Sequence, residues 1–199
     1  MKITDIRRHV KRGDRYSVYV DGTYLFSFSE TGLLNSGLRI GQELTKTEIL
    51  ELKQKATLDK AYDRTLNLIS IRRRSEWEIS QYLLQKDYGK DTIEIILNTL
   101  RKNGYADDFA FAKAWVENRR LLKSTSKRRL ELELRQKRIA DSTIKEVINA
   151  DDTDERDVLR ELVARKRKQT RYKDDIKLMQ YLIRQGYNYG DVKTVIKEA

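Results

Sequence analysis

In this 199-residue chain, three pairs of adjacent carboxylates are the best candidates for a general acid and a general base. A general acid and a general base must face one another across a substrate, and neighbours in sequence do not. Each pair stands where a helix is expected to begin, and an aspartate there accepts hydrogen bonds from unpaired backbone N–H groups. We therefore predict helix capping for all three. The pairs are Asp107-Asp108, Asp151-Asp152 and Asp174-Asp175.

Metal and nucleophile chemistry lack the residue types that they need. The sequence contains no cysteine, and its one histidine, His9, has no cluster of further ligands around it. Glycine-rich loops that cradle phosphate are absent from the sequence as well. We predict that the protein is not an enzyme and that it requires no metal and no cofactor.

Positive charge is what the chain has in excess. Its 42 Lys and Arg residues against 31 Asp and Glu give a net charge of +11, which attracts nucleic acid or a surface covered by it. Basic residues recur at or just before the second helix of each repeat described below, and Arg138 lies further along that helix in the second repeat. We predict that these residues bind this partner. The candidate binding residues are Arg72, Arg73, Arg74, Lys127, Arg128, Arg129, Arg138, Lys166, Arg167, Lys168, Arg171 and Lys173.

Ordinary helix chemistry is the alternative explanation of this charge. Cations suit the C-terminal end of a helix, and a charged run is often a solvated face. Residues 127–129 fall in the first turn of a helix, where a cation is mildly unfavourable, so an external anion is favoured there. Ion pairs within the helix are predicted four residues apart, and they are Glu131–Arg135 and Glu133–Lys137.

The elements that position these residues repeat along the chain. Six apolar positions recur 51 residues further on, and again 48 residues after that. A period near fifty is typical of helical repeats. We predict a mainly α fold, with tandem three-helix repeats over 58–105, 106–150 and 151–199 in an elongated, curved array. The positions are Ile79, Leu83, Tyr88, Ile93, Ile96 and Leu97; Leu130, Leu134, Ile139, Ile144, Val147 and Ile148; and Leu178, Leu182, Tyr187, Val192, Val195 and Ile196.

Capping residues predict where the helices begin and end. Ser75 to Glu78 and Asp91 to Glu94 have the spacing of capping boxes, which open the second and third helices of the first repeat. Asn103-Gly104 ends the third helix. Ahead of the repeats, the capping box from Thr45 to Glu48 opens a helix that is expected to run to about Lys55.

The first 57 residues differ from the rest and predict a small sheet. Residues 15–29, RYSVYVDGTYLFSFS, have the pattern of a β-hairpin around Asp21-Gly22. A preceding strand from about Ile3 to Val10 is expected to complete the sheet, because a lone hairpin is marginally stable in water.

The turn of this hairpin decides which residues share a face. A two-residue turn at Asp21-Gly22 splits the apolar residues between two faces. A three-residue loop over 20–22 places them on one face, and we favour it. The pairs that it predicts are Val18 opposite Tyr24 and Tyr16 opposite Phe26.

Aromatic residues near the repeat cores are interpreted as packing residues and not as platforms for nucleic-acid bases. Tyr88, Tyr187, Trp77 and Trp115 lie at or near core positions. Tyr88 and Tyr187 match Ile139 in the middle repeat, and an isoleucine cannot stack on a base.

Three short segments of the chain carry a family resemblance: Arg74-Ser75, the join Gly104-Tyr-Ala-Asp-Asp-Phe-Ala110, and Leu134-Arg-Gln-Lys-Arg-Ile139. They resemble the RecX family of recombination regulators. The family's usual join is Gly-Tyr-Leu-Asp-Asp-x-x-Phe-Ala; here Ala106 replaces Leu, and Phe111-Ala112 completes the pattern. Arg138 stands where the family commonly has Gly. The resemblance covers about Leu58 to the C-terminus, and the N-terminal strands look like the extension found in some members.

The resemblance implies a non-enzymatic modulator of the RecA recombinase. Similar proteins bind RecA, lie in the helical groove of the RecA–DNA filament, and restrain ATP hydrolysis and strand exchange in recombination, DNA repair and the SOS response. Weak, non-specific binding of naked DNA is expected as well. The alternative is a helical-repeat protein that acts on DNA directly, without RecA, and reads it with its third helices.

The sequence also bears on location. No apolar run approaches membrane-spanning length, and residues 1–10 are too charged for a signal peptide. We expect a cytoplasmic protein that acts as a monomer.

Overall fold

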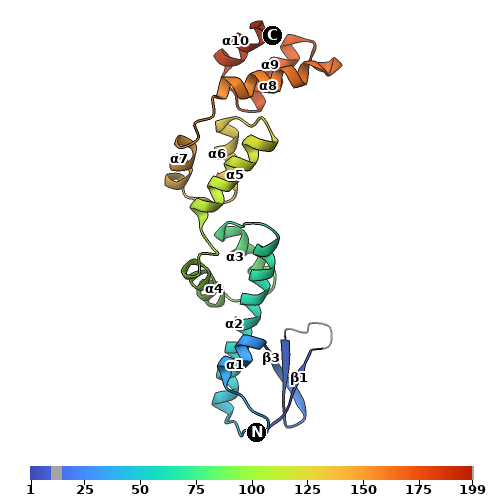
Figure 1. Ribbon diagram of the computed structural model, residues 1–199, viewed down its shortest axis with the longest axis vertical. Coiled ribbons are helices and arrows are strands. Elements are labelled where there is room, and N and C mark those ends of the chain that lie inside the picture. The colour runs from blue at the N-terminus through green and yellow to red at the C-terminus, as the bar shows by residue number, and fades with distance from the viewer. Residues whose placement is uncertain (10–14, 199) are drawn as a thin grey trace. The chain divides into compact units, whose positions relative to one another are not determined.

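The computed structural model describes residues 1–9 and 15–198 and is mainly α-helical, as predicted, with one small antiparallel sheet near its N-terminus (Figure 1). The chain divides into two compact units, Met1–Arg74 with Ile79–Tyr105, and Ser75–Glu78 with Ala106–Ala199. The elements are β1 (Ile3–Arg8), β2 (Arg15–Val20), β3 (Thr23–Ser29), α1 (Glu30–Ser36), α2 (Lys46–Ile71), α3 (Glu76–Leu84), α4 (Lys90–Lys102), α5 (Asp108–Leu122), α6 (Lys127–Gln136), α7 (Asp141–Asn149), α8 (Glu155–Arg167), the short 3₁₀ helix η1 (Thr170–Tyr172), α9 (Asp175–Arg184) and α10 (Tyr189–Glu198).

The β2–β3 hairpin closes through a two-residue turn, so the predicted three-residue loop is wrong. Val20 pairs with Thr23, and the two residues between them, Asp21 and Gly22, have φ angles of 47° and 80°. Positive φ at both central residues is the geometry of the type I′ turn, whose twist matches that of the strands.

A β-bulge then restores the continuous apolar face. The pairing shifts by one residue after Tyr19 and Tyr24, so that Leu25 has no partner of its own on β2. This extra residue moves Phe26 opposite Val18, and the hairpin has one buried face despite its short turn. The resulting pairs, which replace those predicted, are Tyr19–Tyr24, Val18–Phe26 and Tyr16–Phe28.

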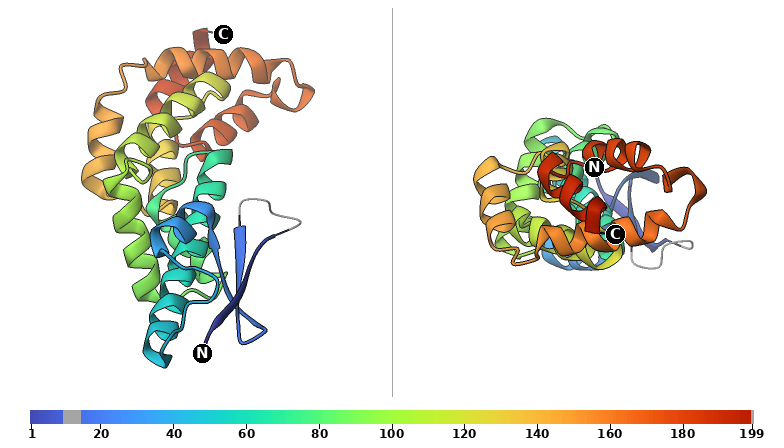
Figure 2. Two further views of the ribbon diagram at one scale, coloured as in Figure 1. Left: turned by 60° about the horizontal axis from the view of Figure 1, so that its bottom comes forward. Right: turned by 90° about the horizontal axis from the view of Figure 1, so that it is seen from above.

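The sheet and two helices share the core of the first unit. β1 pairs antiparallel with β2, as predicted, while the expected strand end at Val10 lies outside the described residues. Figure 2 shows the sheet beside α1 and α2. The buried apolar residues of this core come from all three strands, from the first half of α2 and from Leu44, just ahead of α2. They are Ile3, Val18, Val20, Phe26, Phe28, Leu44, Ile49, Leu52 and Ala56.

α1 has no counterpart among the predicted elements, whereas the start of α2 is confirmed. The Ser29 side chain ends β3 and caps α1 by accepting from the Gly32 N–H at 3.0 Å. At the start of α2, Thr45 Oγ1 accepts from the Glu48 N–H at 3.2 Å. The Glu48 carboxylate accepts in turn from the Thr45 N–H at 2.7 Å, which completes the capping box.

α2 continues without a break to Ile71, so the end expected near Lys55 is wrong. Residues 46–71 contain neither proline nor glycine, and nothing in them interrupts the backbone hydrogen bonds. Buried residues occur in both halves of the helix, from Ile49 to Thr65. The domain limit predicted after residue 57 therefore falls inside α2, and the division of the chain into repeats stays a prediction.

The repeated apolar positions form the cores of the helical segments, as their spacing predicted. All of them are buried except Leu97, which is half-buried. Trp77, which we expected to pack in a core, is 38% exposed. It lies in the first turn of α3, two residues before the buried Ile79, and residues two apart on a helix face different sides.

Two helices begin with caps other than those predicted. α4 starts at Lys90 with Gly89 as its N-cap and no side-chain hydrogen bond, so the capping box at Asp91 is wrong. Asp91 lies in the first turn, where a carboxylate still suits the helix dipole. α8 is capped by Asp154, and not by Asp151 or Asp152. The end of α4 at Asn103-Gly104 is confirmed.

The turns after α3, α6 and α9 share one backbone geometry. Asp87, Arg138 and Gly186 have φ angles of 62°, 59° and 94°. This left-handed conformation commonly follows a helix and favours glycine. Arg138 therefore forms the same turn as a glycine, and replacing the family's Gly there does not change how α6 ends.

Serine residues make the same pair of contacts at two places in the second unit. Ser126, the N-cap of α6, accepts from a backbone N–H of its own first turn and donates to the carbonyl of Gln185, the C-cap of α9, at 2.7 Å. Ser75 likewise accepts from its own first turn and donates to the carbonyl of Lys137, the C-cap of α6, at 3.1 Å. We call each of these contacts a serine joint.

An acidic residue completes each serine joint. The backbone N–H of Lys127 donates to the Glu155 carboxylate at 2.8 Å, and that of Glu76 donates to Asp108 at 2.9 Å. Both amides belong to the first residue of a helix, and both acids stand at the first residue of a later helix. The serine joints therefore satisfy helix-end groups that have no partner within their own helix.

Candidate nucleic-acid interface

The first group of candidate cations, Arg72 to Arg74, follows the end of α2. Arg72 has an extended backbone, and its guanidinium donates to the Arg73 carbonyl at 2.9 Å. The Arg73 side chain is exposed and lies beside Tyr105 along a hollow of about 470 Å³. Arg74 is half-buried, and its Nε has no hydrogen-bond partner among the described residues.

The second group lies in the first turn of α6, where we predicted it. The half-buried Lys127 donates from Nζ to the Asp151 carbonyl at 3.2 Å. Arg129 pairs with Glu133, with 3.6 Å between Nε and Oε1. Arg128 is exposed and forms no hydrogen bond or ion pair with any described residue. Of the three, only Arg128 has neither a hydrogen bond nor an ion pair with the described residues that would hold its side chain away from an external anion.

The rest of α6 confirms one of the two predicted ion pairs. Arg135 pairs with Glu131 at 3.6 Å and with Asp141 at 3.0 Å. The pair between Glu133 and Lys137 is wrong: Lys137 Nζ binds Glu78 at 2.6 Å instead. Because α6 ends at Gln136, Lys137 is its C-cap and does not lie on the same helix face as Glu133.

Glu133 binds α5 instead. Its carboxylate accepts from Trp115 Nε1 at 2.9 Å and from Arg119 Nε at 2.7 Å. The Arg119 guanidinium lies over the Trp115 ring, 4.5 Å from its centre, and Lys137 Nζ lies 5.3 Å from the same centre. The half-buried Trp115 is thus a packing residue, as predicted, and so are the buried Tyr88 and Tyr187.

The third group surrounds η1 and has partners for some of its members. Lys166 Nζ lies 4.8 Å from the centre of the Tyr181 ring, and Arg167 pairs with Asp175 at 2.5 Å. The Arg171 guanidinium lies near the Tyr172 ring. Lys168 and Lys173 are exposed, and their side chains form no hydrogen bond or ion pair within residues 1–9 and 15–198.

Arg138 is exposed and also has no side-chain partner in the described chain. The second unit therefore presents at least four cations whose charge is not matched internally. We call Arg128, Arg138, Lys168 and Lys173 the free cations.

The carboxylate pairs have structural roles. Asp107 caps α5, accepting from the Ala110 N–H at 2.9 Å, and Asp174 caps α9, accepting from the Lys177 N–H at 3.1 Å, as predicted. The cap predicted at Asp151 is wrong. Its carboxylate binds Arg120 at 2.6 Å, and the two side chains are only 8% and 10% exposed.

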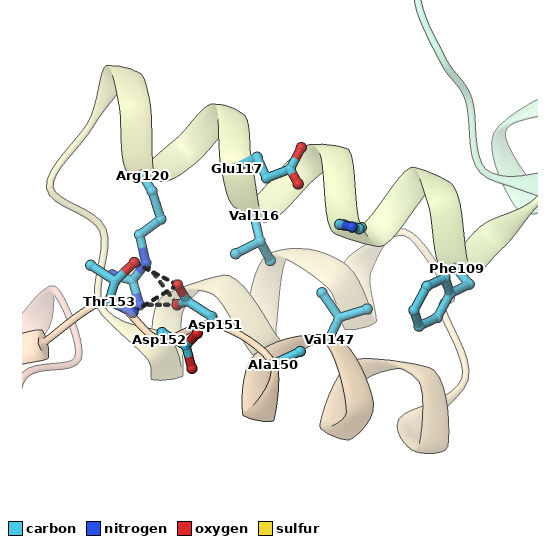
Figure 3. Close-up of a pocket in the computed structure, with 10 residues that line it drawn as sticks. Phe109, Val116, Glu117, Arg120, Val147, Ala150, Asp151, Asp152 and Thr153 are labelled. Atoms are coloured by element: carbon cyan, nitrogen blue, oxygen red, sulfur yellow. Dashed lines mark hydrogen bonds and ion pairs between the residues drawn. The ribbon is translucent and has the colours of Figure 1, made fainter.

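The Arg120–Asp151 pair closes one end of a hollow of about 270 Å³ between α5 and α7 (Figure 3). Phe109, Val116 and Val147 line it, so its walls are largely apolar. Burial raises the pKa of Asp151, but the Thr153 hydrogen bonds and the Arg120 guanidinium outweigh burial and hold the pKa below its ordinary value. A carboxylate in this state accepts hydrogen bonds and is a poor proton donor near neutral pH.

The described chain shows neither a metal site nor a membrane span. Histidine and carboxylate side chains do not gather in threes that could hold a metal ion anywhere in residues 1–9 and 15–198. None of the helices in this part of the chain has the length and apolar character of a membrane span.

Known proteins match this chain along most of its length. Family models match it three times: the RecX N-terminal domain over residues 1–45, the first RecX three-helix domain over 61–100, and the second over 107–148. Regulatory protein RecX of Oceanobacillus iheyensis is 31% identical over 207 residues, which cover 99% of this chain and 76% of that protein. The corresponding protein of Listeria monocytogenes serotype 4a is 32% identical, with 100% and 76% covered.

The chain belongs to the RecX family. A crystal structure of regulatory protein RecX agrees, with 27% identity, a TM-score of 0.74 and 98% of both chains covered. A second crystal structure, of RecX from Lactobacillus salivarius, has a TM-score of 0.61 and 22% sequence identity. The match covers 71% of this chain and 95% of that chain, and it shows similarity of fold alone. The resemblance found in the sequence is confirmed. Membership of the RecX family supports a regulatory role for the chain.

Some basic residues of this chain were not among the candidates predicted from sequence. Lys53, Lys60 and Arg64 line hollows of the first unit together with Lys86. Their spacing on α2 is i, i+7 and i+11, which places them on one face of a helix. This spacing could have found them, but the helix had been expected to end near Lys55.

Proposed function

We propose that the protein binds the RecA recombinase and the RecA–DNA filament, and that it restrains ATP hydrolysis and strand exchange. It acts as a monomer and catalyses no reaction itself. Membership of the RecX family supports the regulatory part of this proposal. RecA assembles on bacterial DNA, so we place the protein in the cytoplasm.

The observation that carries the proposal is the set of free cations. Arg128, Arg138, Lys168 and Lys173 are exposed and have no internal partner among the described residues. Cations of this kind attract phosphate and acidic protein surfaces, and they set the rate and the selectivity of association. A filament groove lined by DNA phosphate and acidic side chains is a partner of matching charge.

A retention experiment with matched variants tests the proposal. RecA loaded with ATP on immobilised single-stranded DNA should retain the wild-type protein at a salt concentration where the naked strand retains little. Arg128→Gln/Arg138→Gln should lower retention by the filament. Arg156→Gln/Arg160→Gln should lower it less, because those two arginines already pair with carboxylates.

Each pair of substitutions removes two positive charges, so net charge is the same in both variants. Equal losses would show that net charge alone attracts the filament and would remove the role assigned to Arg128 and Arg138. Equal retention of wild type by naked strand and filament would favour direct action on DNA and contradict the proposed role of RecA.

A further inference from the structure

A basic hollow in the first unit has no part in the proposed function. It lies where β3, α2 and the end of α3 meet, and it consists of two adjoining spaces of about 460 and 490 Å³. Lys60, Arg64 and Lys86 line both spaces, so the two lie side by side along these three cations. Lys53 adds a fourth positive charge to the larger space, which no carboxylate of the described chain lines.

The acidic residues nearby already take part in ion pairs. Asp63 lines the smaller space, but its carboxylate binds the guanidinium of the buried Arg15. Arg15 also binds Asp59 at 2.9 Å and donates to the Ser27 carbonyl at 2.9 Å. These contacts join β2 and β3 to α2, so the walls of the hollow are held in place.

Aromatic rings lie beside the cations. Tyr24 on β3 is 50% exposed and lines the larger space, and Tyr82 on α3 lines the smaller one. Lys86 Nζ lies 5.8 Å from the centre of the Tyr82 ring. The Tyr88 ring, 9% exposed, has Arg64 at 5.8 Å and forms part of the wall. Accessible rings among several cations suit a ligand that is both anionic and flat.

We propose that this hollow binds single-stranded nucleic acid. Backbone phosphates lie against Lys53, Lys60 and Lys86, and an unstacked base lies against the Tyr24 or the Tyr82 ring. Single strands offer both groups at once, whereas a duplex keeps its bases stacked inside. An acidic peptide would use the cations and leave the rings without a role. This binding needs no RecA, so its test is independent of the test of the proposed function.

Fluorescence anisotropy of the full-length protein with a labelled oligothymidylate, without RecA, tests the phosphate contacts. Lys53→Gln/Lys86→Gln should weaken binding and flatten the plot of log affinity against log salt by roughly 0.7 for each phosphate that the variant no longer binds. The control, Lys55→Gln/Lys90→Gln, changes two exposed lysines of the same unit that do not line these hollows. Equal effects of the two variants would overturn the proposal.

An abasic oligonucleotide of the same length tests the base contact. Tyr24→Ser should lower the affinity for oligothymidylate roughly tenfold, the usual scale for one stacked base, and should leave the affinity for the abasic strand unchanged. Equal losses for both strands would mean that no base lies on this ring. If polyglutamate competes as strongly as unlabelled oligothymidylate, the ligand is an acidic protein and not nucleic acid. This result would contradict the proposal.

Discussion

Arg138 combines an unfavourable backbone with a charge that nothing in the described chain uses. Its φ of 59° lies in the left-handed region, which costs an L-residue about 1–2 kcal/mol relative to the right-handed one. The side chain is exposed and unpaired among the described residues. A residue of this kind at a turn that favours glycine points to a contact outside the protein.

Arg138→Gly should therefore separate stability from binding. The substitution relieves the backbone strain, which raises the free energy of unfolding. The greater conformational freedom of glycine in the unfolded chain offsets part of this increase. We expect the free energy of unfolding to rise by up to about 1 kcal/mol, measured by urea denaturation, and filament binding to fall. Asp87→Gly, at the matching turn after α3, is the control. It should change the free energy of unfolding in the same direction and leave filament binding unchanged. Undiminished binding by Arg138→Gly would remove Arg138 from the interface.

At the residue scale, the contacts that the sequence predicted correctly lie close along the chain, and contacts that join distant segments were missed. The caps at Asp107 and Asp174 are local and were found. Asp151 looked the same in sequence, but its partner Arg120 lies 31 residues away. Nothing in the local pattern distinguishes a capping aspartate from one that pairs with a distant arginine.

At the scale of elements, the spacing of apolar residues was the strongest signal, and one substitution tests it. Leu134 is fully buried in the core that α5, α6 and α7 share. Leu134→Ala should lower the free energy of unfolding by ~2–5 kcal/mol, because it leaves a cavity in this core. Leu132→Ala, at a residue of the same helix that is 44% exposed, should cost far less. Similar denaturation midpoints for both variants would contradict the assigned register of α6.

The serine joints are a second feature at this scale. Ser126→Ala removes the cap of α6 and leaves the Gln185 carbonyl without its hydroxyl partner. We expect a loss of ~1–3 kcal/mol in unfolding free energy. Ser142→Ala, at an exposed position in α7, should stay within about 0.5 kcal/mol of wild type. A loss for Ser126→Ala no greater than for Ser142→Ala would show that the joint adds nothing to stability.

Elements were missed where two local signals compete. The β-bulge at Leu25 let a two-residue turn and a continuous apolar face coexist, and our choice between turn types assumed that they exclude one another. α1 follows β3 without a linker and contains Gly32, a weak helix former, so propensity did not suggest it. The length of α2 was missed because the helix opened at Thr45 and the first repeat, from residue 58, were assigned to separate parts of the chain, whereas one helix spans both.

At the scale of the whole molecule, composition and repeat pattern predicted a basic helical protein, and the order of short motifs predicted its family. The binding residues were harder to predict. Sequence alone does not distinguish Lys127, which binds a carbonyl, from Arg128, which has no partner in the described chain. The basic hollow needs β3, α2 and α3 to meet, and only the fold brings them together.

The most direct test of the proposed function is the rate of ATP hydrolysis by RecA on single-stranded DNA, measured while this protein is added. The wild type should lower the rate in a saturable manner. Arg128→Gln/Arg138→Gln should need a higher concentration for half of the effect, and Arg156→Gln/Arg160→Gln should behave more like the wild type. An unchanged rate at saturating wild-type protein, with the protein shown to be folded, would contradict the proposal that it restrains RecA.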